Sequence, residues 1–219
     1  GGGGGGGGAE VRFETALARA MLALHARDAG AIDAECAAAR RALAPAVAAA
    51  AMESYHRAYP HAVQLQLLHE LQSAAAAVDT TVIGHTDDGS AALVELLGHW
   101  RTQLPLLCNA PHALEPVIAV RVGVLRDVVA RAPTPEVRRL AAEGVGSCWL
   151  TFAACARAAG YTETARHALM EAGASDGAAA AYQLAKLEWE DGRQGEALGR
   201  LHQLHRTLRD MLTFLTLGF

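Results

Sequence analysis

Lysine and asparagine are nearly absent from this sequence. Lys186 is the single lysine among 19 Lys and Arg residues, and Asn109 is the single asparagine. The charged residues are interspersed and sum to a net charge of −4, so there is no basic patch of the kind that holds phosphates. A peptide-binding repeat protein would line its concave face with repeated Asn, Lys or Arg anchors. These shortages argue against direct nucleic-acid binding and against peptide capture.

Long apolar runs and paired cysteines are also missing. No uncharged stretch approaches the roughly 18 to 20 residues that a membrane span requires, and the N-terminus lacks the basic and apolar regions of a signal peptide. The four cysteines form no CxxC pair, so buried free thiols are expected rather than disulfides or a zinc site: Cys36, Cys108, Cys148 and Cys155. The chain is therefore predicted to be soluble and intracellular, with no membrane partner.

Alanine and leucine are abundant, whereas aromatic residues make up only 5% of the chain. With 52% hydrophobic residues in 219, the chain can bury a sizeable core, and this composition favours helix over sheet. The eight glycines at positions 1–8 are expected to be disordered, because glycine loses the most entropy on ordering. We predict an all-helical body that begins at residue 9.

One helix-turn-helix pattern occurs twice between Ser147 and Leu204. The two copies share glycine, alanine and leucine at one spacing: Gly160, Ala165 and Leu169, then Gly192, Ala197 and Leu201. Glycine suits the turn, and alanine lets two antiparallel helices approach closely. Trp149 is predicted to fill the groove between such helices. Because one hairpin cannot bury its apolar stripe alone, the pattern predicts an α-solenoid of TPR-like antiparallel hairpins.

Apolar residues at spacings of three and four predict further helices near residues 10–27, 31–50, 52–77, 91–108, 115–131 and from 136 onward. Residues 79–90 are predicted to form a long loop. Pro45 should bend or divide its helix, and Pro60 should kink or restart the next one. Tyr55 and Tyr59 are interpreted as core residues of the 52–77 helix, because their spacing continues its apolar stripe.

The sequence offers few candidates for chemistry. The segment Gly144-Val145-Gly146-Ser147 is interpreted as a helix break rather than an anion cradle, because no strand precedes it. His202 and His205 lie three residues apart but have no third ligand within helical reach, so solvated histidines are expected. Cys148 has no neighbouring His or Lys to lower its pKa. No catalytic, cofactor-binding or metal-ligating residue and no cofactor is predicted.

Three segments resemble the FAT domain of the phosphatidylinositol 3-kinase-related protein kinases. Met52–Leu71 reads MESYHRAYPHAVQLQLLHEL, and Glu115–Leu125 reads EPVIAVRVGVL, which is similar to the ATR checkpoint-kinase branch of that family. Val145–Leu204 continues the likeness through Trp149 and both turn glycines, and through further residues: Tyr182, Ala185, Lys186 and Trp189. Pro60, Ser147 and residues 205–219 depart from the pattern. Each matched position is interpreted as a packing or turn position.

The resemblance implies a segment of a large nuclear serine/threonine kinase of the DNA-damage and replication-stress checkpoint. Its partners would be the kinase domain and other helical repeats of the same parent protein, together with checkpoint partner proteins. The chain has no glycine-rich phosphate loop followed by lysine, no His-Arg-Asp or Asp-Arg-His triplet and no Asp-Phe-Gly, so it is not expected to be the catalyst. The alternative is a free-standing TPR-like adaptor.

The expected domains are a FAT-type helical-repeat domain over residues 9–204 and a tail over residues 205–219. That tail is either a helical extension or an artefact of the gene model.

Overall fold

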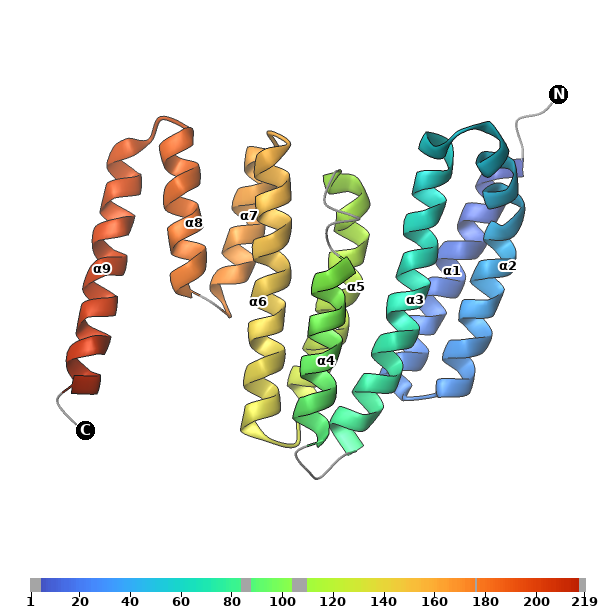
Figure 1. The fold of residues 1–219 in the computed structure, drawn as a ribbon, viewed down its shortest axis with the longest axis horizontal. Coiled ribbons are helices and arrows are strands. Elements are labelled where there is room, and N and C mark those ends of the chain that lie inside the picture. Colours follow the sequence, from blue (N-terminus) through green and yellow to red (C-terminus); the bar gives the residue numbers. More distant parts are fainter. Residues whose placement is uncertain (1–4, 84–87, 104–109, 176, 217–219) are drawn as a thin grey trace. The chain divides into compact units, whose positions relative to one another are not determined.

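The computed structural model describes residues 5–83, 88–103, 110–175 and 177–216 (Figure 1). Over these ranges it contains nine helices and no strand, which confirms the predicted all-α solenoid of helical hairpins. The helices are α1 (Gly5–Ala26), α2 (Ala29–Glu53), α3 (Tyr55–Ile83), α4 (Asp88–Gln103), α5 (Pro111–Arg131), α6 (Pro135–Ala158), α7 (Thr162–Gly173), α8 (Gly177–Glu190) and α9 (Gln194–Thr216).

The chain forms two compact units. Unit 1 spans Gly1–Cys108 and His112–Ala141, and unit 2 spans Asn109–Pro111 and Ala142–Phe219. Unit 1 therefore holds α1 to α4, almost all of α5 and the start of α6, whereas unit 2 holds the rest of α6 with α7, α8 and α9.

The core of unit 1 consists of the predicted apolar stripes. Phe13 and Leu24 of α1, Ile32 of α2, and Leu67 and Leu71 of α3 are all at most 5% exposed. Trp100 of α4 is 2% exposed and is the largest fully buried side chain among the described residues. The α5 helix adds a dense apolar set at 0–4% exposure: Leu114, Val117, Ile118, Val120, Val122, Val124, Leu125 and Val128. Burial of these faces is the main force that holds the helices of unit 1 together.

Several predicted helix boundaries are wrong. The predicted 52–77 helix is divided at Ser54, whose extended backbone (φ −169°, ψ 155°) ends α2 and whose Oγ accepts from the N–H of Arg57 in the first turn of α3. A serine suits this role because its hydroxyl satisfies a free amide at the helix start. Pro45 does not divide α2, and Pro60 lies inside α3. Tyr55, placed at the exposed start of α3, is 81% exposed rather than part of the core.

The predicted loop at 79–90 is also wrong at both of its ends. α3 continues to Ile83 and α4 begins at Asp88, while residues 84–87 lie outside the described ranges. Thr80 and Thr81, which look like loop residues in the sequence, donate their hydroxyl hydrogen bonds to carbonyls four residues earlier in α3. This back-bonding lets threonine remain in a helix.

Glycine lies inside helices at two places where the sequence predicts a break or disorder. Gly144 and Gly146 are buried inside an unbroken α6, so the predicted helix break is wrong. Gly5–Gly8 belong to α1, although disorder is expected there, and residues 1–4 lie outside the described ranges. Each interior glycine costs a helix only about 1 kcal/mol relative to alanine, which packing and continued hydrogen bonding can offset.

The start of α5 also differs from the prediction, because the helix begins at Pro111 and not at the expected Glu115.

The two glycine turns behave as predicted. Gly160 and Gly192 have φ values of 82° and 79°, and an added Cβ would meet no atom within 4 Å at either position. Each glycine amide donates to the carbonyl three residues earlier, and the following amide donates to the carbonyl five residues earlier. This is the Schellman arrangement that closes a helix. Glycine is therefore favoured at these turns because of its backbone conformation and not because space is short.

A third copy of this turn joins α1 to α2 and was not predicted. Arg27 has φ 58°, its amide donates to the carbonyl of Leu24, and the next amide donates to the carbonyl of Ala23. Five and nine residues after Arg27 lie Ile32 and Cys36, both buried, at the spacing of the alanine and leucine in the other two copies. The copy is hidden in the sequence because arginine replaces the turn glycine.

Candidate functional site

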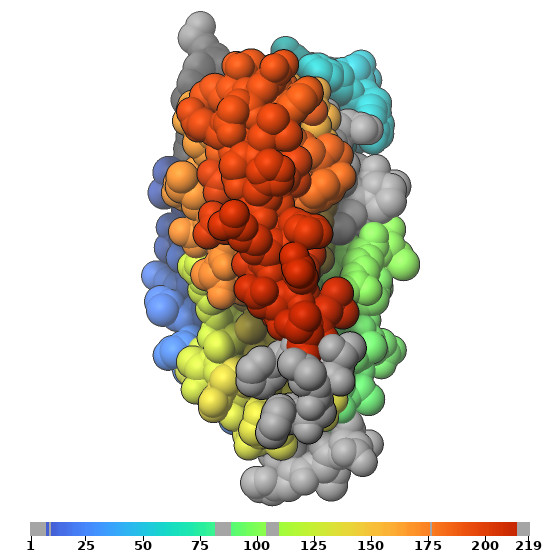
Figure 2. All heavy atoms as spheres, turned by 90° about the vertical axis from the view of Figure 1, so that its left-hand side faces the viewer, coloured from blue at the N-terminus to red at the C-terminus, as the bar shows by residue number. Residues whose placement is uncertain are grey.

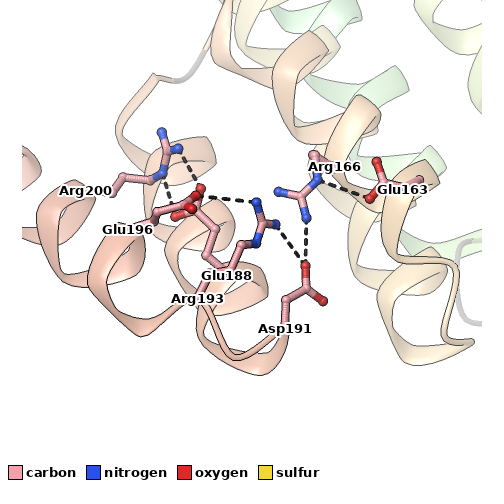
Figure 3. A network of polar contacts seen from close by, with 7 residues as sticks. All are labelled: Glu163, Arg166, Glu188, Asp191, Arg193, Glu196 and Arg200. Carbon is pink, nitrogen blue, oxygen red and sulfur yellow. Dashed lines mark hydrogen bonds and ion pairs between the residues drawn. The ribbon is translucent and has the colours of Figure 1, made fainter.

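The most connected polar cluster of the described chain lies in unit 2, at the turn ends of its helices (Figure 3). Asp191 Oδ2 accepts from Arg166 Nη2 of α7 at 2.7 Å and from Arg193 Nη2 at 3.0 Å. Arg157 of α6 donates to Glu190 of α8 at 2.6 Å. These pairs connect α6, α7 and α8 at the rim of the unit, where the side chains are partly exposed. These contacts join neighbouring helices to one another.

The deepest member of this cluster is Glu188, whose side chain is 3% exposed. Arg200 of α9 donates to both of its carboxylate oxygens, from Nε at 3.0 Å and from Nη2 at 2.7 Å. These hydrogen bonds, opposed by burial and assisted by the charges of Arg200, Arg193 and Arg166, hold the pKa of Glu188 below its usual value. The same hydrogen bonds raise the pKa of Arg200. The pair therefore remains ionised and joins α8 to α9.

Unit 1 contains a second bidentate pair, and this one is fully buried. Arg121 of α5 donates to Glu70 of α3 from Nε at 2.7 Å and from Nη2 at 2.5 Å, and the two side chains are 2% and 0% exposed. Gln66 Nε2 donates to the Oε1 of Glu70 at 3.1 Å, and the Arg121 guanidinium lies 5.2 Å from the ring centroid of Trp100. Both charges are thus satisfied inside an apolar core.

The buried pair joins two of the segments that carry the family resemblance. Glu70 is the acidic residue near the end of Met52–Leu71, and Arg121 is the basic residue within Glu115–Leu125. Neither segment by itself predicts that these two residues meet. The available signal was that Glu70 and Arg121 each lie among apolar residues. A charge buried there needs a partner of opposite sign, because an unpaired buried charge is too costly.

A groove of about 410 Å³ lies between α3 and α4. His69 and His99 stand across it with their ring centroids 5.8 Å apart, edge to face. Small residues and one carboxylate complete its lining: Ser73, Ala76, Ala77, Thr80, Ala92, Glu95 and Leu96. In the described part of the chain, no three His, Cys, Asp or Glu side chains converge as metal ligands.

The remaining sequence candidates do not come together. Gly144–Ser147 lie inside α6, where the amides are part of the helix. His202 and His205 are exposed on α9. Three of the four cysteines are described, and they are buried thiols outside any disulfide, as predicted: Cys36, Cys148 and Cys155. Burial raises the pKa of the Cys36 thiol. Cys108 and Asn109 lie outside the described ranges.

The aromatic residues differ in burial from what the sequence pattern predicts. Trp149 is half-buried, with its Nε1 inside the fold, and contacts Phe152 edge to face with ring centroids 6.3 Å apart, whereas Trp100 of unit 1 is 2% exposed. The matched residues are not all packing or turn residues, because Tyr182 and Trp189 are 49% and 50% exposed. Helix faces of unit 2 that the sequence pattern treats as interior therefore reach the surface.

None of the helices in the described ranges has the length and apolar character needed to cross a membrane.

Comparison with known proteins identifies one family. The family model of the FAT domain matches residues 10–215. The chain is 31% identical over 193 residues to serine/threonine-protein kinase ATR of Arabidopsis thaliana, which covers 87% of this chain and 7% of that protein. It is also 31% identical over 197 residues to serine/threonine-protein kinase ATR of Oryza sativa subsp. japonica, again covering 87% of this chain and 7% of the relative. No solved structure matches.

Proposed function

Because this chain belongs to the FAT domain family, we propose that it is a scaffold segment of an ATR-like serine/threonine protein kinase that acts in the DNA-damage and replication-stress checkpoint. In this role its helices support and regulate a kinase domain through repeat packing. The chain spans about 7% of the length of the curated relatives it matches, so the kinase activity, the checkpoint partners and a nuclear location belong to this proposal.

The observation that carries the proposal is a set of exposed apolar residues on α9, the helix drawn in red in Figure 2. α8 has 14 residues and α9 has 23, so α9 extends beyond its antiparallel partner by about two and a half turns. Leu208, Met211 and Leu212 lie in this extension and are 45%, 58% and 62% exposed. We call these three residues the α9 overhang. A helical repeat buries such residues by stacking on its neighbour, as a segment of a longer helical array would do.

The proposed domain extends over residues 9–204 and is followed by the proposed tail over residues 205–219, of which residues 205–216 belong to α9. Its partners would be the kinase domain and other helical repeats of the same parent protein, and checkpoint proteins. We propose no catalytic role for the chain, because the groups that hold ATP phosphates, magnesium and the acceptor hydroxyl have no counterpart in its sequence.

The scaffold role is tested inside the longer kinase polypeptide. Ala165 is fully buried in the α6–α7 hairpin, so Ala165→Phe should force those helices apart, and Gly160→Val should break their turn. We expect both variants to lower kinase output while ATP contacts remain intact, since each repeat supports its neighbour. Met170→Ala, at a site 64% exposed on α7, is the matched control and should leave output unchanged.

Two results would contradict the scaffold role. If both variants distort the segment, as judged by limited proteolysis, yet kinase activity and the DNA-damage response stay at the unmodified level, a free-standing adaptor becomes the better interpretation. Turnover of Mg-ATP by the purified isolated chain would contradict the non-catalytic assignment.

A further inference from the structure

An exposed aromatic stripe runs along α8. Tyr182, Lys186 and Trp189 are spaced at i, i+4 and i+7, which places them on one face of the helix. Tyr182 and Trp189 are about half exposed, and Lys186 is exposed as well. Ala185, Leu187 and Glu188 occupy the buried faces of the same helix. We call the three exposed residues the α8 stripe.

The charge within the α8 stripe has no anionic partner in the described chain. The Lys186 ammonium lies 5.5 Å from the ring centroid of Tyr182, and no described carboxylate lies within ion-pair distance of it. The arginines that contact α8 are all paired: Arg157 with Glu190, Arg166 with Asp191 and Arg200 with Glu188. Lys186 is thus a cation held against an aromatic ring, with its remaining donors open to an incoming anion.

The neighbouring helix repeats the pattern. Leu198, His202 and His205 of α9 have the same i, i+4, i+7 spacing, and all three are exposed. The Glu188–Arg200 pair joins the two helices of this antiparallel hairpin. Both helices therefore carry exposed apolar and ionisable side chains.

From this arrangement we propose that the α8 stripe is a docking site for an acidic amphipathic helix of a partner protein. Tyr182 and Trp189 would cover the apolar side chains of that helix, and Lys186 would pair with an aspartate or glutamate between them. Tyrosine and tryptophan are the residues that most often dominate binding at protein interfaces, because they bury a large area at small entropic cost. The proposal does not depend on the kinase assignment, because it rests on this hairpin alone.

Charge complementarity favours an acidic protein segment over nucleic acid or a second copy. A nucleic-acid backbone binds through several cationic contacts, whereas the α8 stripe supplies one lysine in a chain whose net charge is −4. One carboxylate of a helix needs only that one lysine. A second copy of the stripe would bring two Lys186 ammonium groups together without an anion between them.

The test is a peptide-display selection against the full 219-residue chain, with Lys186→Gln as the counter-selected bait. We expect enriched peptides to combine Asp or Glu with aromatic or aliphatic residues at helical spacing. The most enriched peptide, labelled with a dye, is then titrated by fluorescence anisotropy. Binding should weaken at least about tenfold with Lys186→Gln and with Trp189→Ala, as expected for the centre of an interface. Lys186→Glu should reverse the selection and enrich Lys and Arg.

Arg206→Gln is the matched control, because it removes an exposed positive charge elsewhere on α9 and should weaken binding less than about twofold. Circular dichroism must show unchanged helix content for each variant. No enrichment, enrichment without acidic residues, or equal weakening by Arg206→Gln overturns the proposal. Tighter binding of single-stranded oligonucleotide than of the peptide, or a dimer abolished by Trp189→Ala, overturns it in favour of those other partners.

Discussion

The two units place the same chemical pair in different surroundings. In unit 1 the bidentate contact of Glu70 with Arg121 is buried in an apolar core beside Trp100. In unit 2 the bidentate contact of Glu188 with Arg200 has one buried partner and one that is 39% exposed. The other arginine pairs of unit 2 lie at its rim and are shared among α6, α7 and α8.

The two kinds of pair differ in what the loss of one partner costs. A buried charge pair gains little over an apolar replacement, but losing one partner leaves an uncompensated charge in the core. Rim pairs lose little when one partner is removed, because water and salt solvate the survivor. In unit 1, α3 and α5 must therefore pack so that Glu70 meets Arg121. In unit 2, the helices are connected through ion pairs that salt and pH can weaken.

The largest expected effect comes from breaking the buried pair on one side. Arg121→Met should lower the free energy of unfolding by about 3–5 kcal/mol, because it leaves the Glu70 carboxylate buried without its partner. The double variant Glu70→Leu with Arg121→Met should recover most of that loss, since both charges are then removed. Urea denaturation followed by circular dichroism measures both values.

Arg166→Met in unit 2 is the control for that experiment and should cost less than about 1 kcal/mol. A loss for Arg166→Met equal to that for Arg121→Met would remove the distinction between the two units.

The second prediction compares the stability that Trp100 contributes to unit 1 with the stability that Trp149 contributes to unit 2. Trp100→Ala in unit 1 should cost about 3–5 kcal/mol, because the side chain is 2% exposed and fills the core. Trp149→Ala in unit 2, which the sequence pattern places in a groove between helices, should cost clearly less, since Trp149 is half-buried. Thermal and urea unfolding of the two variants in parallel would test this order. A greater loss of unfolding free energy for Trp149→Ala than for Trp100→Ala would mean that Trp149 does fill the groove between its helices.

A pH titration should detect the Glu188–Arg200 pair. The folded-state pKa of Glu188 lies below its usual value of 4.5, so its contribution to stability is present above that pH and is lost as the pH falls through the folded pKa. Arg200→Gln should remove about 1–2 kcal/mol at pH 6 and much less at pH 3. Denaturation of both proteins at a series of pH values gives the difference directly. A difference that stays constant with pH would mean that Arg200 acts through packing alone.

The smallest expected effect compares the repeated turns. Arg27→Gly should raise the free energy of unfolding by about 1 kcal/mol, because arginine is strained in the left-handed region that Arg27 occupies. Gly160→Ala should lower it by a similar amount, although an added Cβ would meet no atom there. Chemical denaturation should show opposite signs for the two variants. The same sign for both would mean that the turns are not equivalent.

The helical class, the hairpin repeat and the family were all accessible from local sequence. Apolar spacing identified the buried faces of α1, α2 and α4, and glycine spacing located two turns, because periodicity and backbone conformation depend on near neighbours. The helix ends were less accessible. Ser54, Thr81 and Gly144 each favour one conformation locally, and hydrogen bonds or burial in the assembled fold decided the outcome.

Contacts at the candidate sites also depend on the assembled fold. By itself, the sequence determined that this is an all-helical member of the FAT domain family, since those conclusions need only composition, period and motif. Tertiary structure alone decided that Glu70 meets Arg121 across 51 residues, that Arg27 occupies a glycine conformation, and that Tyr182, Lys186 and Trp189 share an exposed face without an anion. These outcomes depend on which helices pack together, and packing brings distant residues into contact or leaves a face uncovered in ways that no local pattern encodes.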